Sequence, residues 1–158
     1  MSTDNRKILI TGPPGCGKTT LCTRAIDLIK GVCEVGGILS MEIREGRSRK
    51  GFKIIDILTE EEGILAHVNQ RAGPRIGKYR VNLNDLDEVG VNAISSAVEK
   101  CDVVVIDEIG PMELCSEKFV DAVNNAFDSD KKIIATIHFR SKHPVIESIK
   151  KREDVATY

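Results

Sequence analysis

Apolar residues occur in short runs between glycine-rich or charged segments, and the pattern inside the runs changes along the chain. The segments 7–11, 101–110 and 132–138 contain nearly continuous apolar runs rich in β-branched side chains. Runs without polar alternation are typical of strands buried on both faces of a parallel sheet. We therefore predict a central sheet with these three segments as parallel strands.

Other segments carry apolar residues at helical spacing, which predicts helices between and after these strands. The predicted helices are 20–30, 84–100, a helix capped by Ser116 with Phe119, Val120, Val123 and Phe127 on its buried face, and 144–152. The first helix is expected to bury Leu21, Ala25, Leu28 and Ile29. Residues 154–158 have the pattern of a strand that begins and then stops. Alternating strands and helices indicate an α/β fold.

The middle of the chain has a different pattern. Residues 38–44 and 51–58 alternate apolar and polar positions around a polar, glycine-containing turn, which predicts an antiparallel hairpin. Residues 64–68 are a candidate third strand and 80–83 a candidate edge strand, whereas the basic, glycine-rich segment 71–79 is predicted to be a mobile loop. We interpret residues 1–158 as one domain that carries a β-rich insertion at about 36–83.

The composition narrows the class of protein. A chain of 158 residues with 41% hydrophobic and 30% charged residues is ordinary for one globular domain. The net charge of −1 creates no strong field for nucleic acid or an acidic membrane. The apolar runs are too short to span a bilayer. We therefore expect a monomer without a membrane or nucleic-acid partner.

The cysteines indicate a reducing compartment. Their number is odd, they form no C-x-x-C pair, and no histidine lies at zinc-finger spacing from them. Together with an N-terminus unlike a signal peptide, this predicts a cytoplasmic protein. The five are Cys16, Cys22, Cys33, Cys101 and Cys115.

The segment 12–19 matches G-x-x-x-x-G-K-[ST], the phosphate-binding loop called Walker A, and it lies between a predicted strand and a predicted helix. Its glycines allow backbone N–H groups to surround an anion at a helix N-terminus. Lys18 is expected to reach the β- and γ-phosphates, and Thr19 to bind Mg²⁺. The predicted nucleotide-binding residues of this segment are Gly12, Pro13, Pro14, Gly15, Cys16, Gly17, Lys18, Thr19 and Thr20.

The run 101–110 ends in two acidic residues, as the Walker B motif does. Asp107 stands where P-loop enzymes hold Mg²⁺. Glu108, directly after it, is the candidate that orients and polarises the attacking water. Asp107 to Gly110 also reads D-x-x-G, so the Gly110 N–H is a candidate γ-phosphate sensor.

Two histidines and one basic segment also have predicted roles. His138 follows a predicted strand and is a candidate neighbour of the γ-phosphate, whereas His67 is expected to have a structural role. The basic segment 44–50 is interpreted as a solvated hairpin tip.

These segments together resemble a family of small P-loop nucleoside-triphosphatases, sometimes called cancer-related nucleoside-triphosphatases. The similarity extends over nearly the whole chain. The matching segments are I-T-G-P-P-G-C-G-K-T-T at 10–20, E-I-R at 42–44, R-K-G-F at 49–52, R-I-G-K-Y at 75–79 and V-I-D-E-I-G-P-M-E-L at 105–114.

The resemblance implies a P-loop NTPase fold, a three-layer α/β sandwich with a mainly parallel central sheet and a β-hairpin insertion. It implies slow, Mg²⁺-dependent hydrolysis of ATP, GTP and other nucleoside triphosphates, with Glu108 as the catalytic acidic residue. The family's basic positions fall on Arg49 and Arg75, and Arg75 is a candidate for stabilising the transition state in cis. Family members continue with a strand and a helix after the position of Tyr158, so we expect that this chain is truncated relative to them.

Two alternatives remain from the sequence. A nucleotide or small-molecule kinase on the same fold would use the insertion and the segment 71–80 as acceptor pocket and lid. A slow nucleotide-gated switch is also compatible with the motifs. The guanine-reading N-K-x-D motif does not occur in the sequence, which argues against strict GTP specificity.

Overall fold

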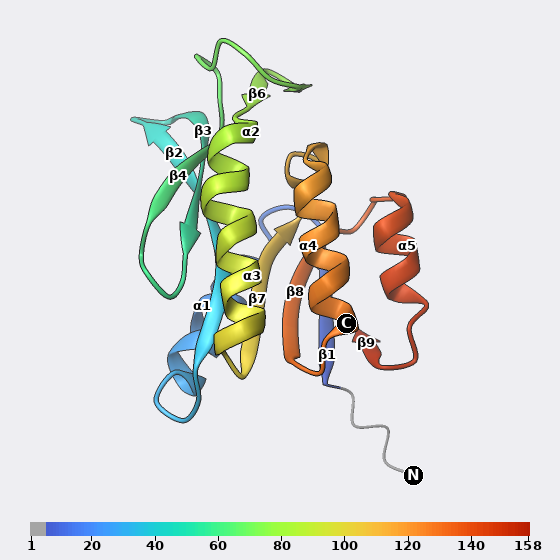
Figure 1. Ribbon diagram of the computed structural model, residues 1–158. Helices are drawn as coiled ribbons and strands as arrows, with labels where there is room; N and C mark the ends of the chain where they lie inside the picture. Colours follow the sequence, from blue (N-terminus) through green and yellow to red (C-terminus); the bar gives the residue numbers. More distant parts are fainter. Residues whose placement is uncertain (1–5) are drawn as a thin grey trace.

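The computed structural model describes residues 6–158, and its centre is a nine-stranded sheet in the order β5-β6-β4-β3-β2-β7-β8-β1-β9 (Figure 1). The strands of the parallel half are β2 (Val35–Glu45), β7 (Val103–Ile109), β8 (Lys132–His138), β1 (Lys7–Gly12) and β9 (Val155–Thr157). The strands of the antiparallel half are β3 (Ser48–Asp56), β4 (Glu62–His67), β5 (Arg75–Ile76) and β6 (Tyr79–Val81).

The parallel half places the predicted motifs at one edge. β1 pairs with β8 in a register that sets Gly12 opposite His138, and β7 pairs with β8 on its other side. Because parallel strands run the same way, the segments that follow β1, β7 and β8 emerge at the same edge of the sheet. The phosphate loop and the acidic pair therefore belong to one region of the molecule.

Strand β2 belongs to both halves. Val35 to Ile38 pair in parallel with β7, and Ile38 to Glu45 pair antiparallel with β3. Gly37 makes the close approach possible, since it has φ +114° and a Cβ there would lie 1.9 Å from the Val105 carbonyl oxygen. The antiparallel extension thus continues a strand of the core.

Helices cover both faces of the sheet (Figure 1). α1 (Lys18–Ile29) packs on one face, where Cys22 and Ile26 contact Val35, Val103 and Val105. The larger core lies on the other face, beneath α3 (Asn92–Lys100), α4 (Glu117–Asp128) and α5 (Pro144–Lys150). Three short turns complete the helical segments: α2 (Leu83–Asp85), the π-helical η1 (Leu86–Val91) and the 3-10 turn η2 (Glu113–Cys115). The predicted α/β sandwich is confirmed.

Most predicted elements form, with three corrections. The predicted edge strand at 80–83 is β6, which pairs with β4 on one side and with β5 on the other and is therefore not at the edge of the sheet. The face that α1 turns to the sheet is only partly as expected. Ile29 packs against the core beside the buried Cys22 and Ile26, whereas Leu21 and Leu28 are 50% and 80% exposed. The segment 71–79, predicted as a loop, contains β5, which pairs with β6 through Ile76 and Tyr79. Two-residue strands carry no periodicity, so sequence patterns do not reveal them.

Two predicted local features are confirmed. The Ser116 hydroxyl caps α4 by accepting a hydrogen bond from the Phe119 N–H at 3.1 Å. His67 has a structural contact, because its Nδ1 accepts a hydrogen bond from the Asn69 N–H at 3.0 Å. Within residues 6–158, no helix is both long and apolar enough to cross a membrane.

Candidate active site

The phosphate loop connects β1 to α1 and needs glycine at three positions. Gly15 and Gly17 have φ of +79° and +101°, values that side chains disfavour, and Gly17 is the N-cap of α1. At Gly12 the reason is space, because a Cβ there would lie 2.6 Å from the Cys16 sulfur. The glycine pattern that defined the motif therefore follows from the backbone path.

The loop is open to an anion. Residues 13–17 are exposed, and so are Thr19 and Thr20 at the start of α1. Lys18 folds back across the loop, where its Nζ donates to the carbonyl oxygens of Gly12 at 2.7 Å and Pro13 at 3.2 Å. A helix N-terminus with unpaired N–H groups and an ammonium beside it attracts phosphate.

Asp107 lies at the end of β7 with an exposed fraction of 2%. The Thr136 hydroxyl donates to its Oδ1 at 2.6 Å, and the Ser40 hydroxyl donates to its carbonyl oxygen at 2.8 Å. Burial raises the pKa of this carboxyl, against the opposing effects of the Thr136 and Thr19 hydroxyls and the Lys18 ammonium. Thr136 on β8 therefore orients the carboxylate, and Ser40 on β2 holds the backbone that carries it.

Glu108 occupies a half-buried position next to Asp107. Burial raises the pKa of its carboxyl, Lys18 and His138 lower it, and Asp107 raises it further. His138, at the end of β8, thus belongs to the electrostatic surroundings of Glu108. A carboxylate with a raised pKa near an ammonium is suited to accept a hydrogen bond from water.

A second glutamate, Glu113, is hydrogen-bonded to the segment that follows Glu108. The Gly110 N–H, a candidate γ-phosphate sensor, donates instead to Glu113 Oε2 at 3.1 Å in the buried interior. For that N–H to contact a phosphate, this hydrogen bond would have to break. Burial raises the pKa of Glu113 to about 8, and the nearby Glu108 adds to the shift.

The residues present fit a magnesium ion. Asp107 Oδ2 is buried, and it is the one buried side-chain oxygen or nitrogen without a hydrogen-bond partner in the part of the chain that the structure describes. A carboxylate oxygen aimed beside the Thr19 hydroxyl is the donor set that Mg²⁺ uses with substrate phosphates. Within residues 6–158, no group of three or more His, Cys, Asp or Glu side chains is arranged to hold a metal ion.

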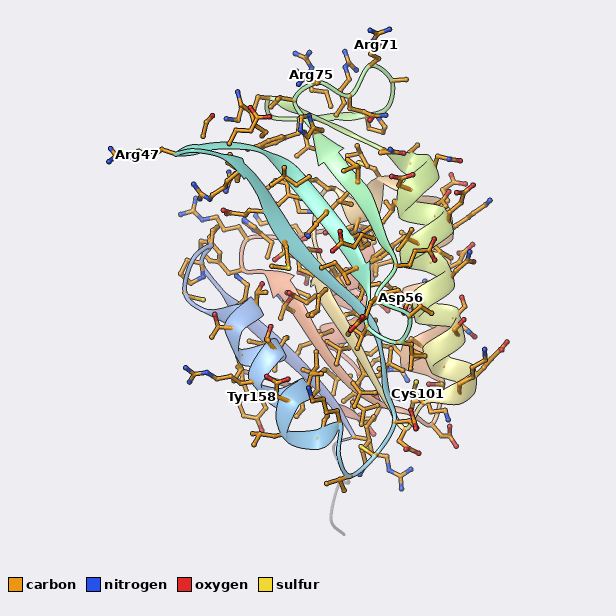
Figure 2. All side chains as sticks on the ribbon, turned by 90° about the vertical axis from the view of Figure 1, so that its left-hand side faces the viewer. Arg47, Asp56, Arg71, Arg75, Cys101 and Tyr158 are labelled. Atoms are coloured by element: carbon orange, nitrogen blue, oxygen red, sulfur yellow. The ribbon has the colours of Figure 1, made fainter. Side chains whose placement is uncertain are left out.

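Two predicted basic residues lie elsewhere. Arg75 is on β5, at the sheet edge opposite β1 and β9, and Figure 2 shows it near Arg71 at one extreme of the molecule. Arg49 is engaged within the antiparallel half, where it donates to the Tyr79 hydroxyl at 2.8 Å and to Glu42 at 3.2 Å. Its guanidinium also lies 5.1 Å from the centre of the Phe52 ring. The structure therefore does not bring Arg75 and Arg49 to the Walker residues.

Sequence reasoning missed Ser40, Thr136 and Glu113. Thr136 had a signal, because it is a polar residue within the otherwise apolar run of β8. Glu113 belongs to the matching segment 105–114 but follows the strand, so nothing in its spacing marks it as buried. The position of Ser40 depends on the pairing of β2 with β7, which the sequence does not specify.

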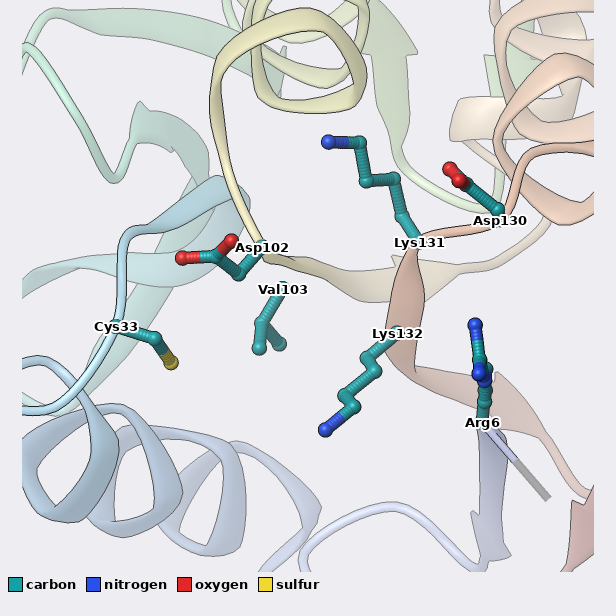
Figure 3. A pocket seen from close by; sticks show the side chains of 7 residues that line it. All are labelled: Arg6, Cys33, Asp102, Val103, Asp130, Lys131 and Lys132. Atoms are coloured by element: carbon teal, nitrogen blue, oxygen red, sulfur yellow. The ribbon is translucent and has the colours of Figure 1, made fainter. Parts of the chain in front are cut away.

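A surface hollow of about 490 Å³ lies away from these residues (Figure 3). It is lined by Arg6, Cys33, Asp102, Val103, Asp130, Lys131 and Lys132. Asp102 and Lys132 stand where β7 and β8 begin, which is the edge opposite the phosphate loop. Since ligands of parallel α/β sheets bind at the carboxyl ends of strands, this hollow is not part of the site.

Comparison with known proteins places the chain among one group of relatives. A family profile described as NTPase matches residues 7–158. Proteins named nucleoside-triphosphatase THEP1 are similar over most of their length. The one from Thermofilum pendens is 51% identical, covering 97% of this chain and 85% of the relative, and the one from Thermotoga maritima is 49% identical, covering 96% and 84%.

Two solved structures have the same fold. THEP1 from Aquifex aeolicus superposes with a TM-score of 0.85 at 30% identity, covering 96% of this chain and 87% of that chain. A human cancer-related nucleoside triphosphatase superposes with a TM-score of 0.79 at 34% identity, covering 97% and 87%.

Proposed function

The chain belongs to this NTPase family, and on that premise we propose that it hydrolyses nucleoside triphosphates to the diphosphate and phosphate at the cluster of Lys18, Thr19, Asp107 and Glu108. The family makes it a hydrolase acting on nucleoside triphosphates. The dependence on Mg²⁺, the range of bases and the role of each residue are the parts that we propose.

The observation that carries the proposal is the convergence of three kinds of group at one sheet edge. These are an open anion-binding loop, an ammonium held across it, and a buried carboxylate with one unpaired oxygen. The nucleotide phosphates would bind to the loop, with Lys18 moving from the carbonyl oxygens of Gly12 and Pro13 to phosphate oxygens. Mg²⁺, bound between phosphate and the oxygens of Thr19 and Asp107, would neutralise charge on the transferring group.

Glu108 would orient the attacking water. It lies one residue beyond Asp107, close enough to Lys18 and His138 for both to lower its pKa. Its half-buried position limits competing solvent, while its carboxylate remains able to accept a hydrogen bond from water. Catalysis would then rest on positioning and electrostatics, as in other phosphoryl transfers.

Loose base specificity follows from where the contacts lie. The proposed contacts are all with phosphate or with the metal, which ATP, GTP, CTP and UTP share. The sequence lacks the N-K-x-D motif, and the names of the relatives specify nucleosides without a base. We therefore propose comparable turnover of several nucleoside triphosphates.

The test is phosphate release from ATP, GTP, CTP and UTP with and without Mg²⁺, using wild type and Glu108→Gln. We expect kcat of the variant to fall about 10²–10⁴-fold, because a glutamine side chain cannot accept a proton from the attacking water. Nucleotide affinity, measured with a fluorescent analogue, should stay the same. Glu99→Gln, which changes an exposed carboxyl on α3, is the control and should retain wild-type turnover.

Two results would contradict the proposal. If wild type binds nucleotide but releases no phosphate, the site serves a kinase or a switch. If Glu108→Gln releases phosphate at the wild-type rate, another group orients the water.

A further inference from the structure

Glu113 is a buried acidic residue that the proposed chemistry does not use. It lies in η2, directly after the segment that leaves β7, with an exposed fraction of 4%. Carboxyl groups are rarely buried to this degree without a cation or several donors. Its position therefore needs a physical reason.

The charges around Glu113 do not supply one. Glu108 and Asp107 both raise its pKa, on top of the effect of burial. The pKa of the Cys115 thiol, on the same turn, is raised by burial and by Glu113. The charges that act on Glu113 are thus carboxylates, whereas Lys18 and His138 act on Glu108.

The contacts that Glu113 makes are with the backbone that carries Glu108. Its Oε2 accepts the Gly110 N–H at 3.1 Å, and this hydrogen bond is buried. The Gly110 carbonyl oxygen in turn accepts the Leu114 N–H at 3.0 Å, which closes the segment 110–114 into a turn. Glu113 therefore holds the backbone that leads from Glu108 into η2.

Gly110 shows how closely the two carboxyl groups approach this backbone. A Cβ on Gly110 would lie 2.7 Å from Glu108 Oε1 and 3.0 Å from Glu113 Oε2. Both carboxyl groups thus border the same Cα, on a residue whose missing side chain leaves them room. A shift of the Glu113 side chain would change the space that is available to Glu108.

We propose that Glu113 is a positioning residue, which holds the segment 108–110 so that the Glu108 carboxylate faces the water and the γ-phosphate. The inference rests on the proposed function and adds a requirement to it. An acceptor for the Gly110 N–H and a side chain of glutamate size are what the role demands. A negative charge is not required, because the interior and its neighbouring carboxylates disfavour one.

These demands separate two substitutions. Glu113→Gln keeps a carbonyl oxygen for the Gly110 N–H and the same length, so kcat should stay within about threefold of wild type. Glu113→Ala removes the acceptor and leaves a gap, so kcat should fall about 10–100-fold, as expected when a reacting group moves by a fraction of an ångström to an ångström. KM and the affinity for nucleoside diphosphate should change less than about twofold in both, since the phosphate loop is untouched.

Gly110→Ala gives an independent variant, because the added Cβ collides with Glu108 Oε1 while the backbone conformation suits alanine. It should reproduce the loss of kcat with unchanged KM. Glu117→Gln, an exposed carboxyl at the start of α4, is the matched control. All kinetics are measured at a temperature where thermal melts show each variant fully folded.

The outcomes divide clearly. Loss of kcat in Glu113→Ala, with rescue in Glu113→Gln, supports positioning. Equal kcat in folded wild type and Glu113→Ala overturns it and leaves the hydrolase assignment intact, as does loss in both Ala and Gln variants, which would mean that the ionisable group itself is needed. Absence of phosphate release in wild type would instead overturn the proposed function.

Discussion

Three carboxyl groups between residues 107 and 113 lie in three different surroundings. Asp107 is buried, with a hydroxyl on one oxygen and the other unpaired. Glu108 is half-buried and near two basic groups. Glu113 is fully enclosed and faces carboxylates. Different environments thus accompany the three roles that we propose for these carboxyl groups, which are metal binding, water orientation and backbone positioning.

Glu113 makes stability depend on pH in a defined window. Its pKa is about 8 in the folded protein, against 4.5 as the ordinary value. Between these values the folded state keeps a proton that the unfolded state releases. The stabilising effect of the protonated group is therefore complete below about pH 4.5 and is lost as pH rises toward 8.

Glu113→Gln should remove this dependence, because glutamine does not titrate. The melting temperature of the variant, relative to wild type, should rise by roughly 5–10 °C between pH 5 and pH 8. Thermal melts followed by circular dichroism measure the difference, with Glu117→Gln as control. A difference that stays constant over this range would show that Glu113 ionises normally.

At the scale of elements, one buried lysine connects β1 to the end of the chain. Lys7 is 4% exposed, and its Nζ donates to the carbonyl oxygens of Phe127 and Ser129, each at 2.7 Å, and to Asp154 at 2.9 Å. The ammonium thereby satisfies the carbonyl end of α4 and holds the segment that leads into β9.

Lys7→Met should destabilise the protein by about 2–3 kcal/mol, since methionine has a side chain of similar length but leaves the buried carbonyl oxygens without a donor. Urea unfolding measures the change. Lys132→Met, at the exposed start of β8, should cost less than about 0.5 kcal/mol. Turnover per folded molecule should be the same in both variants, because Lys7 lies at the other end of β1 from the phosphate loop. If Lys7→Met and the wild type have the same free energy of unfolding, the Lys7 contacts make no net contribution to stability.

The elements also show what the sequence could predict. The buried strands, the helices and the phosphate loop carry local signals, namely apolar runs, helical spacing and a glycine pattern, and the structure has them. The face of α1 does not follow from spacing, because Leu21 and Leu28 fit a helical stripe as well as Cys22 and Ile26 do. The buried face of α1 is determined by the position at which the helix crosses the sheet. The contacts of Ser40, Thr136 and Glu113 with the Asp107 segment likewise depend on which strands become neighbours.

At the scale of the whole molecule, the strand order separates Arg75 from the proposed catalytic cluster. β6, β4, β3 and β2 stand between β5 and β7. At about 4.8 Å per strand, the two are roughly 24 Å apart across the sheet. A side chain does not span this distance.

Arg75→Ala should therefore change kcat by less than about threefold, whereas an arginine that stabilises the transition state contributes about 10³–10⁵-fold. Steady-state phosphate release measures the effect, and Arg71→Ala, on the same exposed segment, is the matched control. A loss of 10²-fold or more in Arg75→Ala alone would mean that the antiparallel half closes over the nucleotide during turnover.

The double pairing of β2 also bears on the order in which the molecule is built. The β2–β3 hairpin joins neighbouring residues and can close within microseconds. The ladder between β2 and β7 begins where Val35 pairs with Val103, a residue 68 positions later. On a ribosome the antiparallel half can thus assemble while β7 and β8 are still being synthesised. Asp107 on β7 and its partner Thr136 on β8 come together only when those two strands are added to the sheet. In a nascent chain the antiparallel half can therefore form before the proposed active site is complete.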